Sequence, residues 1–102
     1  MKYEITFKNG KKMTTDDGIE AFAAEFAEIH GIKQSERKHY CEICSAVAME
    51  DETEWGTPYG KIFDFIADNW TFIKKHEDKL NWDDVALCCT TDGNIENLIE
   101  ED

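Results

Sequence analysis

The stretch TPYGKIFDFIADNWTFIKKHEDKL, residues 57–80, decides the expected fold. Thr57 is a good helix N-cap, and Pro58 suits the first helical position, where its missing N–H breaks no hydrogen bond. At about 3.6 residues per turn, the large apolar side chains fall on one side of a helix. They are Tyr59, Ile62, Phe63, Ile66, Trp70, Ile73 and Leu80, with Phe65 and Phe72 at the margin. No other segment offers so much apolar area, so the sequence predicts that this helix is the centre of the core.

The N-terminal segment, residues 2–15, has the pattern of a β-hairpin. Tyr3, Ile5 and Phe7 alternate with polar residues, which is the period of a half-buried strand. Asn9-Gly10 is the dipeptide preferred in type I′ turns. The sequence therefore predicts two antiparallel strands joined at this dipeptide.

A first amphipathic helix is expected from about residue 17 to residue 30, capped by Thr15 or Asp16 and ended by Gly31. Its predicted apolar stripe contains Ile19, Phe22, Ala23, Phe26 and Ile29. The opposite arc contains Asp17, Glu20, Ala21, Ala24, Glu25 and Glu28. This separation of apolar side chains from acids predicts one buried and one solvated face.

A second helix is expected from residue 36 to about residue 49, with Ser35 as its cap. Its predicted apolar arc contains Tyr40, Cys41, Ile43, Cys44, Val47 and Ala48. The following segment, residues 50–56, is expected to be an acidic loop that leads into residues 57–80.

The segment after residue 80 admits two interpretations. Residues 85–91 and 94–99 have the pattern of two strands joined at Asp92-Gly93, which is a preferred hairpin turn. Alternatively, Asn81 caps a short helix, and the apolar residues near the C-terminus have helical spacing. The hairpin is the preferred interpretation.

Together these elements predict that residues 1–102 form a single α+β domain. A small antiparallel sheet is expected from the N- and C-terminal hairpins, with three helices packed on it. The alternative is a mostly helical fold with one N-terminal hairpin.

The chain carries a formal charge of −12, from 23 Asp and Glu against 11 Lys and Arg. Residues 1–15 carry +3, residues 16–56 carry −8, residues 57–80 are neutral and residues 81–102 carry −7. Such a surface repels phosphate groups, so we do not expect direct binding to nucleic acid or to an anionic membrane. Because no long apolar run is present, a cytoplasmic protein is expected.

Cys41 and Cys44 have the CxxC spacing found in zinc sites, and Cys88 or Cys89 would add a further ligand. However, Cys41 and Cys44 both fall on the apolar arc of a helix, where a free cysteine behaves as a small hydrophobic residue. The expectation is no metal and no cofactor, and a small zinc-binding domain is kept as an alternative.

No motif for a catalytic nucleophile, a phosphate-binding loop or a metalloprotease occurs, so we do not expect an enzyme. The acidic residues favour a protein that binds a basic partner. The specific hypothesis is a stoichiometric inhibitor that blocks a basic nucleic-acid-binding groove by charge mimicry. Anti-restriction, anti-CRISPR and nuclease-immunity proteins of phages and mobile elements work in this way, and the analogy rests on size and charge alone.

The predicted partner-binding residues lie in the first helix and the acidic loop. They are Asp17, Glu20, Glu25, Glu28, Glu50, Asp51, Glu52 and Glu54, with Trp55 as the apolar anchor. None of them is needed for the core pattern, so the sequence predicts that reversing the charge of Glu25 and Glu28 leaves the fold intact. The rival hypothesis is a structural or regulatory self-associating module whose charge only maintains solubility.

Overall fold

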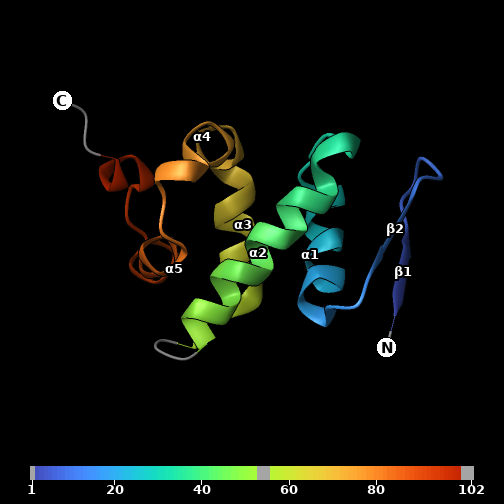
Figure 1. The fold of residues 1–102 in the computed structure, drawn as a ribbon, viewed down its shortest axis with the longest axis horizontal. Coiled ribbons are helices and arrows are strands. Elements are labelled where there is room, and N and C mark those ends of the chain that lie inside the picture. Colours follow the sequence, from blue (N-terminus) through green and yellow to red (C-terminus); the bar gives the residue numbers. More distant parts are fainter. Residues whose placement is uncertain (1, 53–55, 100–102) are drawn as a thin grey trace.

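Helix α2 crosses the middle of the molecule, with the other elements on either side of it (Figure 1). The computed structural model describes residues 2–52 and 56–99. The elements in chain order are β1 (Tyr3–Thr6), β2 (Lys12–Thr15), α1 (Gly18–Ile29), the 3₁₀ helix η1 (Gln34–Glu36), α2 (Arg37–Glu52), α3 (Tyr59–Asp68), α4 (Trp70–His76), η2 (Glu77–Lys79), α5 (Trp82–Thr91) and η3 (Ile95–Leu98). The α+β class is confirmed, and the mostly helical alternative with one N-terminal hairpin describes the arrangement more closely.

The N-terminal hairpin forms as predicted but with a different turn. β1 and β2 pair antiparallel. The Gly10 N–H donates to the Phe7 carbonyl at 2.9 Å, and the Phe7 N–H donates to the Lys11 carbonyl at 2.9 Å. Gly10 has a φ of 85°, whereas Asn9 lacks the positive φ that a type I′ turn requires. The predicted type I′ turn is therefore wrong, and the strands are joined by a three-residue loop that ends at a glycine.

Helix α1 begins close to the predicted position. Asp17 is its N-cap, because the Asp17 Oδ1 accepts a hydrogen bond from the Ile19 N–H at 2.8 Å. The predicted cap Thr15 instead accepts a hydrogen bond from the Asp17 N–H at 3.1 Å. Gly31 follows the helix with a φ of 67°, a conformation that suits glycine.

The most deeply buried side chains of α1, which packs on α2, are alanines. Ala23, Ala24 and Ala27 are fully buried, whereas Phe22 is 43% exposed and Ile29 is 75% exposed. The prediction is wrong for Ala24, which was placed among the acids, and for Phe22 and Ile29, which were placed in the buried stripe. Small side chains allow two helices to approach closely, so the large apolar residues lie at the margin of this contact.

Helix α2, rather than residues 57–80, is the centre of the molecule. It packs against α1, α3 and α5, and all six side chains predicted for its apolar arc are buried. The Tyr40 hydroxyl donates to the Phe63 carbonyl of α3 at 2.7 Å. The predicted centre is wrong because the apolar area of residues 57–80 is divided between two helices that lie beside α2.

Residues 57–80 do not form one helix, because the chain changes direction at Asn69. Asn69 has φ −113° and ψ 19°, and its Nδ2 donates to the Phe65 carbonyl at 2.8 Å. A side-chain amide that bonds to the backbone in this way competes with the regular helix. In Figure 1, α3 is seen from the side and α4 nearly end-on. The predicted buried side is nevertheless confirmed for Ile62, Phe63, Ile66, Trp70, Ile73 and Leu80.

An aromatic cluster joins α1 to α3. The Phe63 ring lies 5.4 Å from Phe22, 5.3 Å from Phe26 and 5.9 Å from Tyr59, measured between ring centroids. Edge-to-face and offset contacts of this kind stabilise aromatic pairs beyond the burial of their surface. The cluster fixes α3 beside α1.

The predicted C-terminal hairpin is wrong, and the helical alternative is confirmed. Residues 82–91 form α5, with Asn81 at the N-cap position. Asp92 has a φ of 56°, and the Gly93 N–H donates to the Cys88 carbonyl at 3.0 Å. Asp92-Gly93 therefore ends a helix. A helix end and a hairpin turn both require residues that accept a positive φ, so this dipeptide alone does not distinguish them.

Candidate functional site

Two of the acids predicted for binding on α1 are held near the start of the helix. Asp17 caps the helix with one carboxylate oxygen, and the other accepts a hydrogen bond from the Ser45 hydroxyl at 2.5 Å. The Glu20 carboxylate lies 3.2 Å from the Lys38 Nζ of α2, and only 16% of its side chain is exposed. Both acids therefore tie α1 to α2.

Glu28 joins three parts of the fold. One carboxylate oxygen accepts the backbone N–H of Lys8 at 2.7 Å, and the other pairs with the Arg37 guanidinium at 2.5 Å. The Lys8 N–H, together with the Arg37 guanidinium, holds the pKa of the Glu28 carboxyl below its usual value. Arg37 is itself buried and donates to the Ile32 carbonyl at 2.8 Å. Glu28 therefore links the hairpin turn, α1 and α2.

Asp51, predicted for the acidic loop, lies inside α2 and is only 1% exposed. Its Oδ2 accepts the Thr57 N–H at 2.6 Å, and its Oδ1 accepts the Thr90 hydroxyl at 3.1 Å. The Thr57 and Thr90 hydroxyls are also 2.6 Å apart. Asp51 thus fixes the chain entering α3 to the end of α5, and its carboxylate does not reach the surface.

The remaining predicted residues fall into two groups. Glu25 and Glu50 are exposed. The side chain of Glu52, together with Glu54 and Trp55, lies outside the part of the chain that the structure describes. Of the six predicted residues whose side chains the structure describes, Asp17, Glu20, Glu28 and Asp51 are therefore bonded within the fold, and Glu25 and Glu50 are exposed.

A different set of acids surrounds a groove on the outer side of α3. Its first hollow, of about 800 Å³, is lined by Asp68, Asn69, Thr71, Phe72, Lys75, His76, Glu96, Asn97 and Ile99. Its second hollow, of about 480 Å³, is lined by Lys61, Asp64, Phe65, Asp68, Cys89 and Asp92. The two hollows share Asp68, and together they are called the acidic groove. Its four carboxylates, all exposed, are those of Asp64, Asp68, Asp92 and Glu96.

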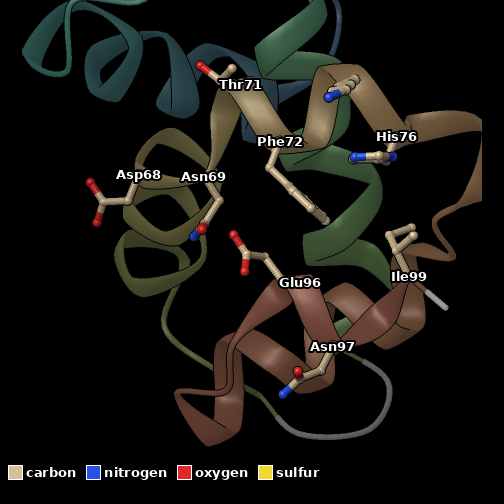
Figure 2. A pocket seen from close by; sticks show the side chains of 9 residues that line it. Asp68, Asn69, Thr71, Phe72, His76, Glu96, Asn97 and Ile99 are labelled. Atoms are coloured by element: carbon tan, nitrogen blue, oxygen red, sulfur yellow. The ribbon is translucent and has the colours of Figure 1, made fainter. Parts of the chain in front are cut away.

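The first hollow lies between the start of α4 and η3 (Figure 2). In Figure 2 the Glu96 carboxylate and the Asn69 amide point toward each other, and the Phe72 ring lies beside them. Phe72 also contacts His76, with the ring centroids 4.5 Å apart. The hollow therefore combines a carboxylate, an amide and an aromatic wall.

The second hollow lies between α3 and the end of α5 and is partly neutralised. The Lys61 Nζ lies 3.3 Å from the Asp92 Oδ1 and also 3.3 Å from the Thr90 carbonyl oxygen. On the α1 side, the His30 Nε2 lies 2.8 Å from the Asp64 Oδ1 and the His30 Nδ1 lies 3.7 Å from the Asp68 Oδ1. Both ring nitrogens of His30 therefore face carboxylates of α3.

Sequence reasoning missed this groove although one signal was present. Asp64 and Asp68 are one helical turn apart on the polar side of residues 57–80, but lysines share that side of the pattern. Asp92 and Glu96 were assigned to a hairpin, which would have placed them elsewhere. Only the packing of α5 and η3 beside α3 and α4 brings the four acids together.

The four cysteines lie in the core. Cys41, Cys44, Cys88 and Cys89 are all buried and unpaired. Burial raises the pKa of the Cys41 and Cys89 thiols to about 12 and that of Cys44 well above its usual value. Within residues 2–52 and 56–99, no three His, Cys, Asp or Glu side chains are grouped to hold a metal ion. The placement of the CxxC motif on the buried arc of a helix is confirmed.

No helix in the described part of the chain has the length and apolar character needed to cross a bilayer. Comparisons of the chain with protein-family models, with curated proteins and with solved structures gave no match.

Proposed function

We propose that this chain is a small acidic binding protein that blocks a basic, nucleic-acid-binding surface of another protein by charge mimicry. The observation that carries the proposal is the acidic groove, in which four exposed carboxylates from α3, α5's C-terminal cap and η3 line two adjoining hollows. Lys61 is the cation that pairs with Asp92, and the chain as a whole carries −12. A basic partner would be steered toward this face.

The spacing of the carboxylates supports mimicry of a nucleic-acid backbone. Asp64 and Asp68 are one helical turn apart on α3, which places their side chains roughly 5–6 Å from each other. Duplex DNA carries one negative charge per roughly 1.7 Å of axis. Asp64 and Asp68 on α3 imitate a short stretch of phosphates locally, and Glu96 adds a carboxylate on the other side of the first hollow (Figure 2). Glu25, Glu50, Glu52 and Glu54, with Trp55 as the apolar anchor, stay partner contacts predicted from the sequence.

The test compares two variants that remove the same number of negative charges. The groove variant carries Asp64→Asn, Asp68→Asn, Asp92→Asn and Glu96→Gln. The control variant carries Asp16→Asn, Glu42→Gln, Asp78→Asn and Asp83→Asn, which change four exposed acids outside the groove. Each tagged protein is incubated with a host-cell lysate at low and at high salt, and the captured proteins are identified. Their dissociation constants and association rates are then measured with purified components.

We expect the original chain and the control variant to capture the same basic protein and the groove variant to lose it. Association should slow as salt rises, because charges more than about 8 Å apart are screened at physiological ionic strength. Short duplex or guide-like nucleic acid should compete for the same surface of the partner. Equal capture by both variants would favour the solubility hypothesis. A partner that binds this chain and its nucleic acid together, with unchanged affinities, would rule out mimicry.

A further inference from the structure

The Glu96 carboxylate is available to a ligand in the first hollow of the acidic groove. Only the backbone of Glu96 is used within the fold. Its N–H donates to the Oδ1 of Asn94, the N-cap of η3, at 3.0 Å, and its carbonyl accepts the Ile99 N–H at 3.3 Å. Among residues 2–52 and 56–99, the carboxylate itself has no hydrogen-bond or salt-bridge partner. Figure 2 shows it directed toward Asn69 and the start of α4. A negative charge therefore stands at one wall of the hollow.

The opposite wall presents a second acceptor. The Asn69 Nδ2 donates to the Phe65 carbonyl at 2.8 Å, and a carbonyl oxygen requires a donor, so this bond fixes which end of the amide faces the backbone. The Asn69 Oδ1 is left as the polar atom for a ligand. The Glu96 carboxylate and the Asn69 Oδ1 are both acceptors, so a ligand placed between them must supply donors (Figure 2).

Phe72 provides an aromatic wall beside these acceptors. Its side chain is half-buried, and His76 covers part of the ring with the centroids 4.5 Å apart. A cation placed over an aromatic ring within about 6 Å of its centroid is attracted by the ring's quadrupole. Lys75 also lines the hollow but forms no salt bridge with Glu96 in the described structure. A ligand cation therefore meets an unneutralised carboxylate.

We propose that the first hollow is a receptor for an arginine side chain of the basic partner. The guanidinium is planar and carries five N–H donors, so it can bind the Glu96 carboxylate in a bidentate manner, donate to the Asn69 Oδ1 and stack on Phe72. A lysine ammonium is a compact charge that cannot make the bidentate and stacking contacts at once. This inference rests on the proposed function, because it names the side chain by which the partner is recognised.

The experiment uses two short peptides in place of the unknown partner. Acetyl-Gly-Gly-Arg-Gly-Gly-amide and the same peptide with Lys in place of Arg have equal charge and differ only in the cationic group. Each is titrated into the isotopically labelled chain, and the backbone amide resonances are followed by NMR. We expect the arginine peptide to bind with a roughly millimolar dissociation constant and to shift the resonances of Asn69, Phe72 and Glu96. The lysine peptide should bind several-fold more weakly.

Three variants locate the contact. Glu96→Gln keeps the shape of an exposed side chain and should weaken arginine-peptide binding about tenfold, since a charge-assisted hydrogen bond is lost. Phe72→Leu should remove the preference for arginine over lysine. Asp78→Asn removes one exposed charge outside the groove and should leave both affinities unchanged. Because the Glu96 carboxylate has no partner in the described part of the chain, Glu96→Gln is also expected to keep the spectrum of the folded protein.

Equal affinities for the two peptides would overturn the proposed arginine site. Resonance shifts spread over acidic residues throughout the chain would also overturn it. An unchanged arginine affinity in Glu96→Gln would overturn it as well. These outcomes are distinct from failure of the proposed function. Arginine-selective binding in the hollow without a captured basic protein would contradict the proposed function but not the arginine site. If the groove variant loses the captured partner but the original chain binds both peptides equally, the arginine site would be contradicted and the proposed function would not.

Discussion

The acids of α1 and the acids of the groove differ in what surrounds them. Asp17, Glu20 and Glu28 accept hydrogen bonds from groups on neighbouring elements and are partly buried. In the groove, Asp68 is 69% and Asp92 is 80% exposed at the side chain; His30 lies 3.7 Å from Asp68, and Lys61 lies 3.3 Å from Asp92. One set of carboxylates is bonded between elements of the fold, whereas the other is largely exposed to solvent.

The supply of donors and cations explains this difference. Helix α1 lies beside the hairpin and α2, which contribute the Lys8 N–H, Arg37 and Lys38. The groove lies beside α5 and η3, and residues 81–102 contain no lysine or arginine. A row of acids on a helix therefore indicates a binding surface only when the elements packed next to it do not neutralise the row.

The largest effect is expected at Asp51, the acid most completely used by the fold. Asp51→Ala leaves the buried Thr57 N–H without its acceptor and removes the contact between the Asp51 carboxylate and the Thr90 hydroxyl, which should destabilise the protein by roughly 1–3 kcal/mol. Asp51→Asn retains one acceptor oxygen and should cost less. Urea denaturation of both variants measures the difference. An unchanged midpoint in Asp51→Ala would show that this carboxylate does not hold α3 to α5.

Glu28 and Glu25 provide the sharpest comparison within one helix. Glu28→Lys places a cation against buried Arg37 and removes the acceptor of the Lys8 N–H, so its melting temperature should fall clearly. Glu25 is exposed, and Glu25→Lys should leave the melting temperature nearly unchanged. The prediction from sequence that both reversals are harmless is therefore retained for Glu25 only. Similar melting temperatures for the two variants would remove the distinction between the two kinds of acid on α1.

Acid pH should reveal the acids that stabilise the fold. Hydrogen bonds from the Lys8 N–H to Glu28 and from Lys74 to Glu36 lower the pKa of both carboxyls below 4.5 in the folded state. As the pH falls below about 4.5, the Glu28 and Glu36 carboxyls become protonated in the unfolded chain before they do so in the folded protein. The stabilisation that these two carboxylates contribute is therefore present at higher pH and is lost on acidification. The double variant Glu28→Gln, Glu36→Gln should lose less stability between about pH 5 and pH 3 than the original chain. Glu25→Gln is the matched control, and an equal pH dependence in all three proteins would contradict the assignment.

The smallest effect on stability is expected in the groove. The groove variant neutralises Asp64, Asp68, Asp92 and Glu96. It loses the contacts to His30 and Lys61 but also loses the repulsion between neighbouring carboxylates. Exposed contacts of this kind contribute little to the free energy of unfolding. The groove variant should therefore unfold at nearly the same urea concentration as the original chain. A large loss of stability would place these acids in the same structural class as Asp51 and would leave the binding proposal without its surface.

Local patterns in the sequence were sufficient for several elements. The alternation of Tyr3, Ile5 and Phe7 predicts the hairpin, and the six apolar side chains from Tyr40 to Ala48 define the buried arc of α2. The interruption at Asn69 was not predicted, since its effect depends on a side-chain hydrogen bond that competes with the helix. The candidate site was less predictable still, because Asp68 and Glu96 are far apart in the sequence and line the same hollow only in the folded chain.

By itself, the sequence determined the charge of the protein, because charge depends on composition alone. It also determined the hairpin and the buried faces of α2 and of residues 57–80, because each depends on the period of apolar residues within a single element. The tertiary structure alone decided that α2 is central, that Asp92-Gly93 ends a helix and that the alanines of α1 face the core. It also decided which carboxylates are neutralised. Neutralisation depends on groups brought close by packing, such as Lys8 and Arg37 at Glu28, and the order of residues along the chain contains no such distances.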